Sequence, residues 1–135
     1  MTPMDESMRA RSRAVVVALA VLAASCAGPV SAQGTSTDQA IRLTQRQIQR
    51  HPQNAMAYFK LGDAYIQKAR QTGDLSYLTL AESALRRSLE LAPRNAGAAR
   101  HLAYVFSARH EFVEAAAQAQ KAIDLDSADS HAYGV

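Results

Sequence analysis

The sequence contains no tryptophan and a single cysteine, and aromatic residues make up only 6% of its 135 positions. A lone cysteine, Cys26, excludes a disulfide within the chain. The sequence also has little excess charge of either sign. Its 15 basic and 12 acidic residues are scattered along the chain and leave a formal net charge of +3. Since nucleic-acid binders carry a basic stripe or patch, this distribution argues against a nucleic-acid partner.

Hydrophobic residues nevertheless make up 48% of the sequence, which is enough for a packed core. Much of this content is alanine, whereas strands prefer β-branched and aromatic residues. Small apolar side chains in bulk favour helices that pack closely. The composition therefore predicts an all-α protein of at most one ordinary domain.

Long hydrophobic runs are absent near the N-terminus as well. The uncharged run from Ala14 to Ala24 is shorter than the roughly 20 residues that span a bilayer. Arginines precede it, at Arg9, Arg11 and Arg13. The small residues Val30-Ser31-Ala32 follow, where a signal peptidase requires them. We therefore expect residues 1–32 to be a cleavable signal peptide, and the protein to be exported to the periplasm or cell envelope of a bacterium.

An alternative cleavage site lies inside the same segment. The stretch "LAASC" at 22–26 resembles a bacterial lipobox, in which the cysteine is lipidated and becomes the mature N-terminus, although Ala23 stands where leucine is preferred. In this alternative the protein is a lipoprotein that is anchored through Cys26, and only then does it contact a membrane. Both alternatives exclude a catalytic cysteine.

Two stretches downstream share one apolar pattern. "AYFKLGDAY" (57–65) and "AARHLAYVF" (98–106) each place apolar or small residues at i, i+3, i+4 and i+7, which is one face of a helix. These residues are Tyr58, Leu61, Gly62 and Tyr65 in the first stretch, and Ala99, Leu102, Ala103 and Phe106 in the second.

A second apolar stripe follows each of these stretches, in residues 75–92 and 112–125. The stripes consist of Leu78, Ala81, Leu85, Ser88 and Leu89, and of Ala115, Ala119, Ala122 and Ile123. Loop-forming residues separate the stripes within each pair, at 72–74 and 109–111. Each pair is therefore predicted to form an αα-hairpin.

The spacing resembles the tetratricopeptide repeat, a 34-residue helix-turn-helix unit with the pattern W-x₂-L-G-x₂-Y…A-x₃-F…P. The first unit matches at Tyr58, Leu61, Gly62, Tyr65, Ala81, Leu85 and Pro93. The second matches at Ala99, Leu102, Ala103, Phe106, Ala115 and Ala119, with Ser127 in place of proline. Pro93 follows Ala81 by 12 residues, and Pro52 follows Ala40 by the same 12 residues, which indicates an earlier half-unit.

The resemblance implies a helix-hairpin solenoid, wound as a right-handed superhelix. Its expected parts are a linker at 33–37, a half-repeat helix at 38–53, a first repeat at 54–94 that is about seven residues longer than the 34-residue unit, a second repeat at 95–128, and the start of a truncated third repeat at 129–135. We expect an N-terminal fragment of a longer protein, whose uncapped C-terminal face supports self-association.

Small residues at the helix crossings are expected to set the packing of each hairpin. We predict that Gly62 faces Ala81 in the first hairpin and that Ala103 faces Ala115 in the second, so that the helix axes approach closely.

No glycine-rich phosphate loop, nucleophile motif or histidine pair with metal-ligand spacing is present. We therefore expect no enzyme activity, no cofactor and no metal. The resemblance implies instead a scaffold that binds a peptide or a partner helix in a concave groove. Its groove positions here are Phe59, Asp63, Ile66, Gln67, Arg100, Tyr104 and Ser107, with Phe59 and Tyr104 as exposed anchors. A further alternative makes the chain the adaptor end of an enzyme whose catalytic domain lies beyond residue 135.

The two cleavage sites predict different mature N-termini. Mass spectrometry of the exported protein is expected to show an N-terminus at Gln33, whereas an acylated Cys26 would establish the lipoprotein alternative. Retention of residues 8–32 in the exported protein would contradict both.

Overall fold

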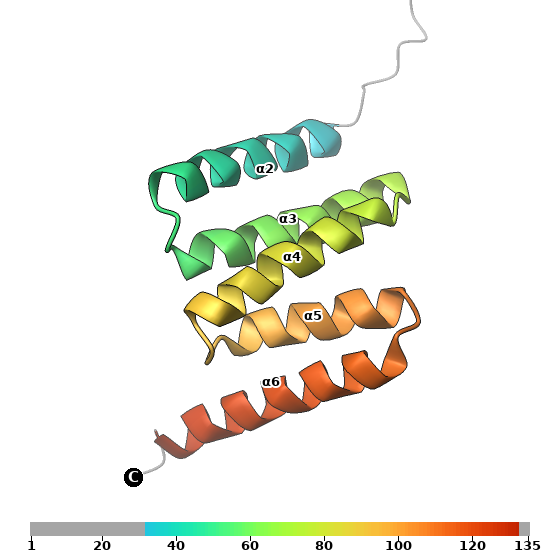
Figure 1. Ribbon diagram of the computed structural model, residues 1–135. Helices are drawn as coiled ribbons and strands as arrows, with labels where there is room; N and C mark the ends of the chain where they lie inside the picture. The colour runs from blue at the N-terminus through green and yellow to red at the C-terminus, as the bar shows by residue number, and fades with distance from the viewer. Residues whose placement is uncertain (1–31, 133–135) are drawn as a thin grey trace, which may run out of the picture. The chain divides into compact units, whose positions relative to one another are not determined.

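The computed structural model describes residues 32–132, with side chains from 36 to 127, and this part of the chain folds into five helices without a strand (Figure 1). The helices are α2 (Ala32–Arg50), α3 (Ala55–Thr72), α4 (Ser76–Leu91), α5 (Ala96–Ala108) and α6 (Phe112–Ala132). Successive helices run in opposite directions and follow one another through the molecule (Figure 1). The prediction of an all-α fold built from helix hairpins is confirmed for these residues. The predicted signal peptide lies outside them, except for Ala32.

The first helix of each hairpin begins at the same short pattern, Pro-x-Asn-Ala. The side chain of Asn54 accepts a hydrogen bond from the backbone N–H of Ala57 at 3.1 Å, and Asn95 accepts one from Ala98 at 3.0 Å. Asparagine is a favoured N-cap because its side-chain oxygen satisfies an N–H group that the first turn leaves without a partner. These caps therefore set where α3 and α5 begin.

The turn within each hairpin lies where the loop residues predict it. Gly73 follows α3 with φ 72°, in the left-handed region, and its N–H donates to Ala69 at 2.8 Å. Glycine adopts this conformation without the steric cost of a Cβ. His110 takes a similar φ of 62° in the second turn. The residues on either side of it, Arg109 and Glu111, are joined by two hydrogen bonds of 2.8 and 2.9 Å, which hold this turn together.

The closest helix approach in the first hairpin is made at Gly62. A Cβ added to Gly62 would lie 2.5 Å from Cγ of Leu85 and 3.4 Å from the carbonyl oxygen of Ala81. Ala81 and Leu85 are themselves fully buried. The prediction that Gly62 faces Ala81 is confirmed, and the missing side chain of Gly62 makes room for Leu85.

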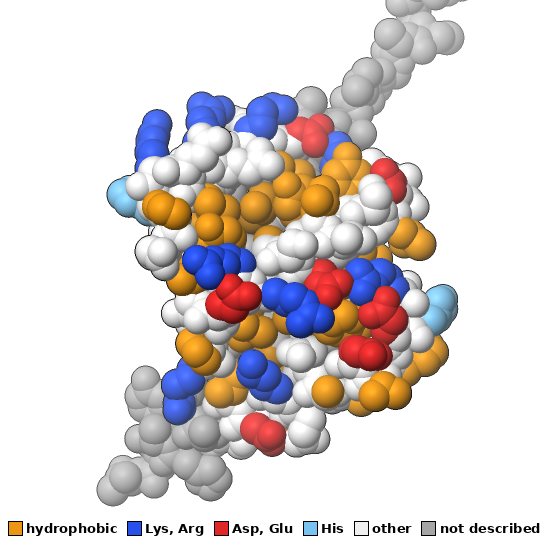
Figure 2. Space-filling view, viewed as in Figure 1, with side chains coloured by type: hydrophobic (Ala, Val, Ile, Leu, Met, Phe, Trp, Pro, Cys, Tyr) orange, Lys and Arg blue, Asp and Glu red, His pale blue; other side chains and the backbone are white. Residues whose placement is uncertain are grey.

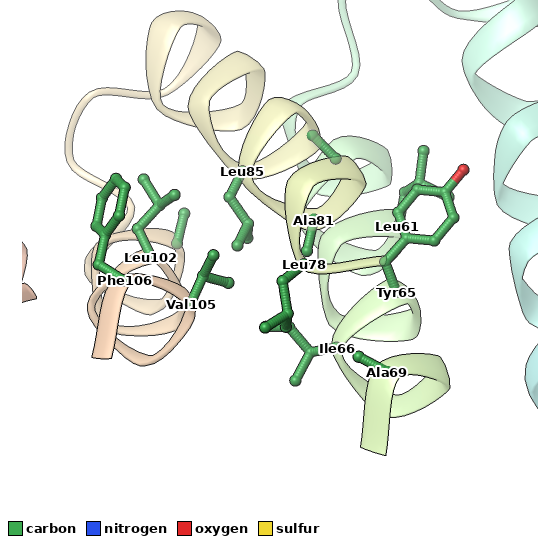
Figure 3. Close-up of a cluster of buried hydrophobic side chains, with 12 residues drawn as sticks. Leu61, Tyr65, Ile66, Ala69, Leu78, Ala81, Leu85, Leu102, Val105 and Phe106 are labelled. Carbon is green, nitrogen blue, oxygen red and sulfur yellow. The ribbon is translucent and has the colours of Figure 1, made fainter. Parts of the chain in front are cut away.

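The core runs continuously from α3 through α4 to α5 (Figure 3). It combines predicted stripe residues with apolar residues from neighbouring positions: Leu61, Tyr65, Ile66, Ala69, Leu78, Ala81, Ala84, Leu85, Ala98, Leu102, Val105 and Phe106. Ser88, predicted on the α4 stripe, is also fully buried, and its hydroxyl donates to the carbonyl oxygen of Ala55 at 2.9 Å. This bond satisfies a buried polar group and joins α4 to the start of α3.

The segment 33–37, predicted to be a linker, lies instead within α2. No proline interrupts the segment, so its backbone N–H groups can join the helix. Thr37 is only 4% exposed, and its hydroxyl accepts a hydrogen bond from Nε2 of Gln71 in α3 at 2.9 Å. Tertiary contact with α3 thus outweighs the modest helix propensity of this polar stretch.

The extension of the first hairpin is visible in α3, which has 18 residues against 13 in α5. Its last turns contact helices on both sides. Lys68 forms an ion pair with Asp38 of α2 at 2.7 Å, and Nε of Arg70 donates to the hydroxyl of Tyr104 in α5 at 3.0 Å. The added length therefore ties α2 and α5 to α3.

The predicted junction near Ser127, with a new repeat from residue 129, is wrong for the described residues, because α6 continues to Ala132. Ser127 lacks the ring of a proline, and its hydroxyl donates to the carbonyl oxygens of Ile123 and Asp124 at 2.9 and 3.1 Å. These bonds are compatible with a continuous helix, whereas a proline would have ended it. Tyr133, the predicted first core residue of a third repeat, lies outside the described residues.

The apolar face of α6 is half exposed, as predicted. Ala122 is 5% exposed against α5, whereas Phe112, Val113 and Ile123 are 62%, 81% and 60% exposed. The period of the helix places these two groups on different sides of α6, so only one side reaches the core.

Acidic and basic side chains lie next to one another across the middle of the face seen in Figure 2. The carboxylate of Glu82 in α4 pairs with Arg86 at 2.7 Å and with Arg109 at 2.8 Å. Arg109 also pairs with Glu111 at 2.8 Å. The guanidinium groups of Arg86 and Arg109 lie over the ring of Phe106, at 5.5 and 5.6 Å from its centroid. This cluster connects α4 to the turn between α5 and α6.

Replacing Gly62 by alanine tests the close approach of α3 and α4. Alanine favours a helix by about 1 kcal/mol over glycine, but overpacking costs about 1–3 kcal/mol. Because Leu85 is fully buried and cannot move away freely, we expect G62A to lower the free energy of unfolding by about 1–2 kcal/mol in urea titrations. In an L85A background the same substitution is expected to become stabilising. A stabilising effect of G62A in the wild-type chain would contradict this packing.

The charge cluster predicts a pH-dependent contribution to stability. Burial raises the pKa of Glu82. Hydrogen bonds from Arg86 and Arg109 together lower this pKa by more than burial raises it, so that it lies below its ordinary value of 4.5. The contribution of Glu82 is therefore fully present above pH 4.5 and is lost as the pH falls through the lower pKa of the folded state.

We expect E82Q to lower the free energy of unfolding by about 1 kcal/mol at pH 7 and by much less near pH 3. Urea unfolding at both pH values measures this difference. E90Q is the matched control, because the pair of Glu90 with Arg87 is exposed and is expected to contribute little to stability at either pH. An equal loss for E82Q at both pH values would count against the cluster.

Candidate functional site

A hollow of about 210 Å³ opens between α3 and α5. Its lining residues are Asp63, Ile66 and Arg70 from α3, and Arg100, His101 and Tyr104 from α5. On each helix the spacing of three or four residues keeps these positions on one face. The site therefore depends on how closely α3 and α5 pack, which the shared core beneath them determines.

The carboxylate of Asp63 faces partners within the protein. Its Oδ2 accepts a hydrogen bond from Gln67 at 2.8 Å, and its Oδ1 lies 3.2 Å from Nε2 of His101. The other ring nitrogen of His101, Nδ1, lies 2.8 Å from the carbonyl oxygen of Gly97 and is the donor in that contact, because a carbonyl oxygen only accepts. Nε2 therefore donates to Asp63 only when the imidazole is protonated. These contacts fix the imidazole at the wall of the hollow.

Arg70 is held differently. Its guanidinium carbon lies 4.5 Å from the centroid of the Tyr104 ring, and Nε donates to the Tyr104 hydroxyl at 3.0 Å. The two terminal nitrogens make no hydrogen bond or ion pair with any residue that the structure describes. The tyrosine therefore positions a guanidinium whose strongest donor pair is available to a ligand.

Arg100 lies on the α5 side of the hollow and is partly neutralised. Its Nη2 pairs with Asp126 of α6 at 2.6 Å, and both side chains are more than half exposed. Exposed pairs of this kind contribute little to stability, so the pair can rearrange when a ligand binds.

The structure brings together four of the seven groove residues predicted from the sequence. Asp63, Ile66, Arg100 and Tyr104 line the hollow. Gln67 and Ser107 are exposed on the same helices without lining it. The prediction that Tyr104 is exposed is confirmed, at 38%. No observation here tests whether any of these residues binds a partner.

The structure buries the predicted groove residue Ile66 and half-buries Phe59, whose predicted exposure is wrong. Ile66 is only 2% exposed and belongs to the core, so it contributes the floor of the hollow. Phe59, predicted as an exposed anchor, is half-buried and packs against the core. Gly97 of α5 has no side chain, which leaves space for the Phe59 ring, and that ring also makes an edge contact with His101 at 5.0 Å between centroids.

Arg70 and His101 were not predicted as site residues. Arg70 lies seven positions after Asp63, so extending the predicted face of α3 by one turn would have found it. His101 adjoins the core residue Leu102, and no sequence pattern distinguishes it. Its role in the hollow depends on the distance from Asp63, which only the packing of α3 against α5 determines.

A second hollow, of about 260 Å³, lies over α3 and α4. Its lining contains no charged side chain and consists of Tyr58, Leu61, Tyr65, Leu80, Ser83 and Ala84. The hydroxyl of Tyr65 already accepts a hydrogen bond from Gln45 of α2. The hollow between α3 and α5 offers more directional chemistry, because it contains a positioned cation.

Within residues 32–132, we find no cluster of three or more histidine, cysteine or acidic side chains suited to a metal ion. No helix in that range has the length and apolar character required to cross a membrane. Cys26, the residue of the lipidation alternative, lies outside the described residues.

No family model matches the chain, and no curated protein shows significant sequence similarity to it. Its fold is similar to a solved structure described as the MamA RS-1 ArsTM double mutant, with a TM-score of 0.61 and 20% sequence identity. The similarity covers 70% of this chain and 49% of the MamA chain, so the chain spans about half the length of that protein. This likeness supports the fold expected from the sequence, a tetratricopeptide-like stack of helix hairpins.

Proposed function

We propose that the protein is a non-catalytic scaffold of the bacterial cell envelope that binds a peptide or a partner helix at the hollow between α3 and α5. The hollow carries this proposal, because it places an exposed tyrosine and a positioned arginine side by side. Tyrosine and arginine are enriched among the residues that dominate binding energy in protein interfaces. A helical-repeat fold supplies such surfaces between neighbouring units.

The size of the hollow supports a protein ligand over a cofactor. Sites for small molecules typically enclose roughly 300–1,000 Å³. At about 210 Å³ the hollow suits one or two side chains of a larger partner. The proposed location rests on the sequence of residues 1–32 alone, and it applies equally to both predicted mature forms, since both retain residues 33–132.

Site-specific crosslinking in the producing cells tests the proposal. A photo-reactive residue at Ser107, exposed on α5 beside the hollow, is expected to give a discrete adduct with a partner protein. The same residue at Ser83, exposed on α4, is the matched control and is expected to give no such adduct.

The adduct must also depend on the hollow itself. We expect Y104A to reduce the yield at Ser107 by about tenfold, in line with the loss of a central interface anchor. Tyr104 is 38% exposed, so this truncation is expected to preserve the fold, which thermal unfolding would verify. Equal adducts at Ser83 and Ser107, or a yield that Y104A leaves unchanged, would contradict the proposal.

A further inference from the structure

The charges around the hollow between α3 and α5 differ in how far they are already paired. Asp63, the one acidic residue of its lining, accepts a hydrogen bond from Gln67 on Oδ2, and its Oδ1 faces Nε2 of His101 at 3.2 Å. Asp126, just outside the lining, is paired with Nη2 of Arg100. Arg70 keeps both terminal nitrogens without a described partner. The lining thus holds one carboxylate that already accepts a hydrogen bond and a guanidinium with two unused donors, which favours an anionic ligand over a cationic one.

The guanidinium of Arg70 is also prepared for binding. Its stacking on Tyr104 and the bond from Nε to the tyrosine hydroxyl restrict a side chain that is otherwise flexible. Ordering a free arginine on binding costs affinity, and this contact reduces that cost. The planar fork of the guanidinium matches a carboxylate, which can accept two parallel hydrogen bonds from it.

The surroundings of Arg70 favour a carboxylate on a side chain. Ile66 and the ring of Tyr104 supply apolar walls, which suit the methylene groups of a glutamate. Exposed residues continue along both helices beyond the hollow, at Gln67 and Ser107. A partner segment can therefore pass over the hollow and insert one side chain from its middle.

We propose that this hollow selects partner segments that carry an internal glutamate or aspartate, whose carboxylate binds the terminal nitrogens of Arg70 over the ring of Tyr104. This inference rests on the proposed scaffold function and names the chemistry of its partner. Arg100 supplies a second donor when its exposed pair with Asp126 opens.

The test uses the full chain and two peptides with blocked termini, Ac-Ala-Leu-Glu-Leu-Ala-NH₂ and its glutamine counterpart. Titrations followed by NMR are expected to shift the Arg70 Nε–Hε and Tyr104 amide signals. The glutamate peptide is expected to bind about tenfold more tightly than the glutamine peptide, because a charged acceptor strengthens the hydrogen bonds to Arg70.

Two variants locate the effect. R70Q is expected to abolish the difference between the peptides, and it replaces an exposed side chain, so the fold is expected to persist. R42Q is the matched control, because it removes an equal charge from the exposed surface of α2 and is expected to retain the tenfold difference.

Equal binding of both peptides, an equal effect of R42Q and R70Q, or no shift with the glutamate peptide up to about 10 mM would overturn the proposal. A further peptide carries glutamine and a free C-terminus. If it bound through Arg70 as tightly as the blocked glutamate peptide, the hollow would instead bind the terminal carboxylate of a partner chain. If the Ser107 adduct persists while the peptides are not discriminated, the acidic preference fails and the scaffold function stands. Loss of the Ser107 adduct would contradict both the acidic preference and the scaffold function.

Discussion

The structure depends on the absence of a side chain at Gly62. Because no Cβ is present there, Leu85 of α4 can lie directly against the backbone of α3. The Cβ of any other residue at position 62 would take up the space that the Leu85 side chain fills. Leu85 then reaches the centre of a core shared by α3, α4 and α5, where Leu102 and Val105 surround it (Figure 3). In α5 the corresponding position is Ala103. The residue at the helix crossing of the second hairpin is therefore one methyl group larger than Gly62.

The helix hairpins are joined to one another by contacts that lie outside this core. The lengthened end of α3 reaches α2 through Lys68 and α5 through Arg70, while the Glu82 cluster joins α4 to the turn before α6. Polar links therefore accompany the buried apolar surface that the helices share. This combination suits a repeat architecture, in which units obtain their stability from the interfaces between them.

The candidate site follows from the same packing. The face of α3 that lines the hollow borders the face that builds the core, so Ile66 serves both. The shared core brings α5 close enough for Tyr104 to support Arg70 and for His101 to engage Asp63. One acidic and one basic group thereby acquire different states, since Asp63 accepts a hydrogen bond from Gln67 and faces His101, whereas Arg70 retains unused donors. That difference, more than net charge, defines what the surface can bind.

Periodicity in the sequence by itself determined the helices, their turns and the buried stripes of α3 to α5, because the repeat of 3.6 residues is a local property of the chain. Of the stripe predicted in α6, only Ala122 is buried, while Ala119 and Ile123 are exposed. Periodicity also placed Asp63, Arg100 and Tyr104 on helix faces that meet. It could not distinguish Phe59 and Ile66 from exposed residues, because their burial depends on the space that Gly97 and the α5 core provide. The continuation of α6 past Ser127 rests on local hydrogen bonds to Ile123 and Asp124. Tertiary structure alone decided that segment 33–37 joins α2 and that Arg70 stacks on Tyr104. Each of these outcomes depends on contacts between residues far apart in sequence, which local pattern does not encode.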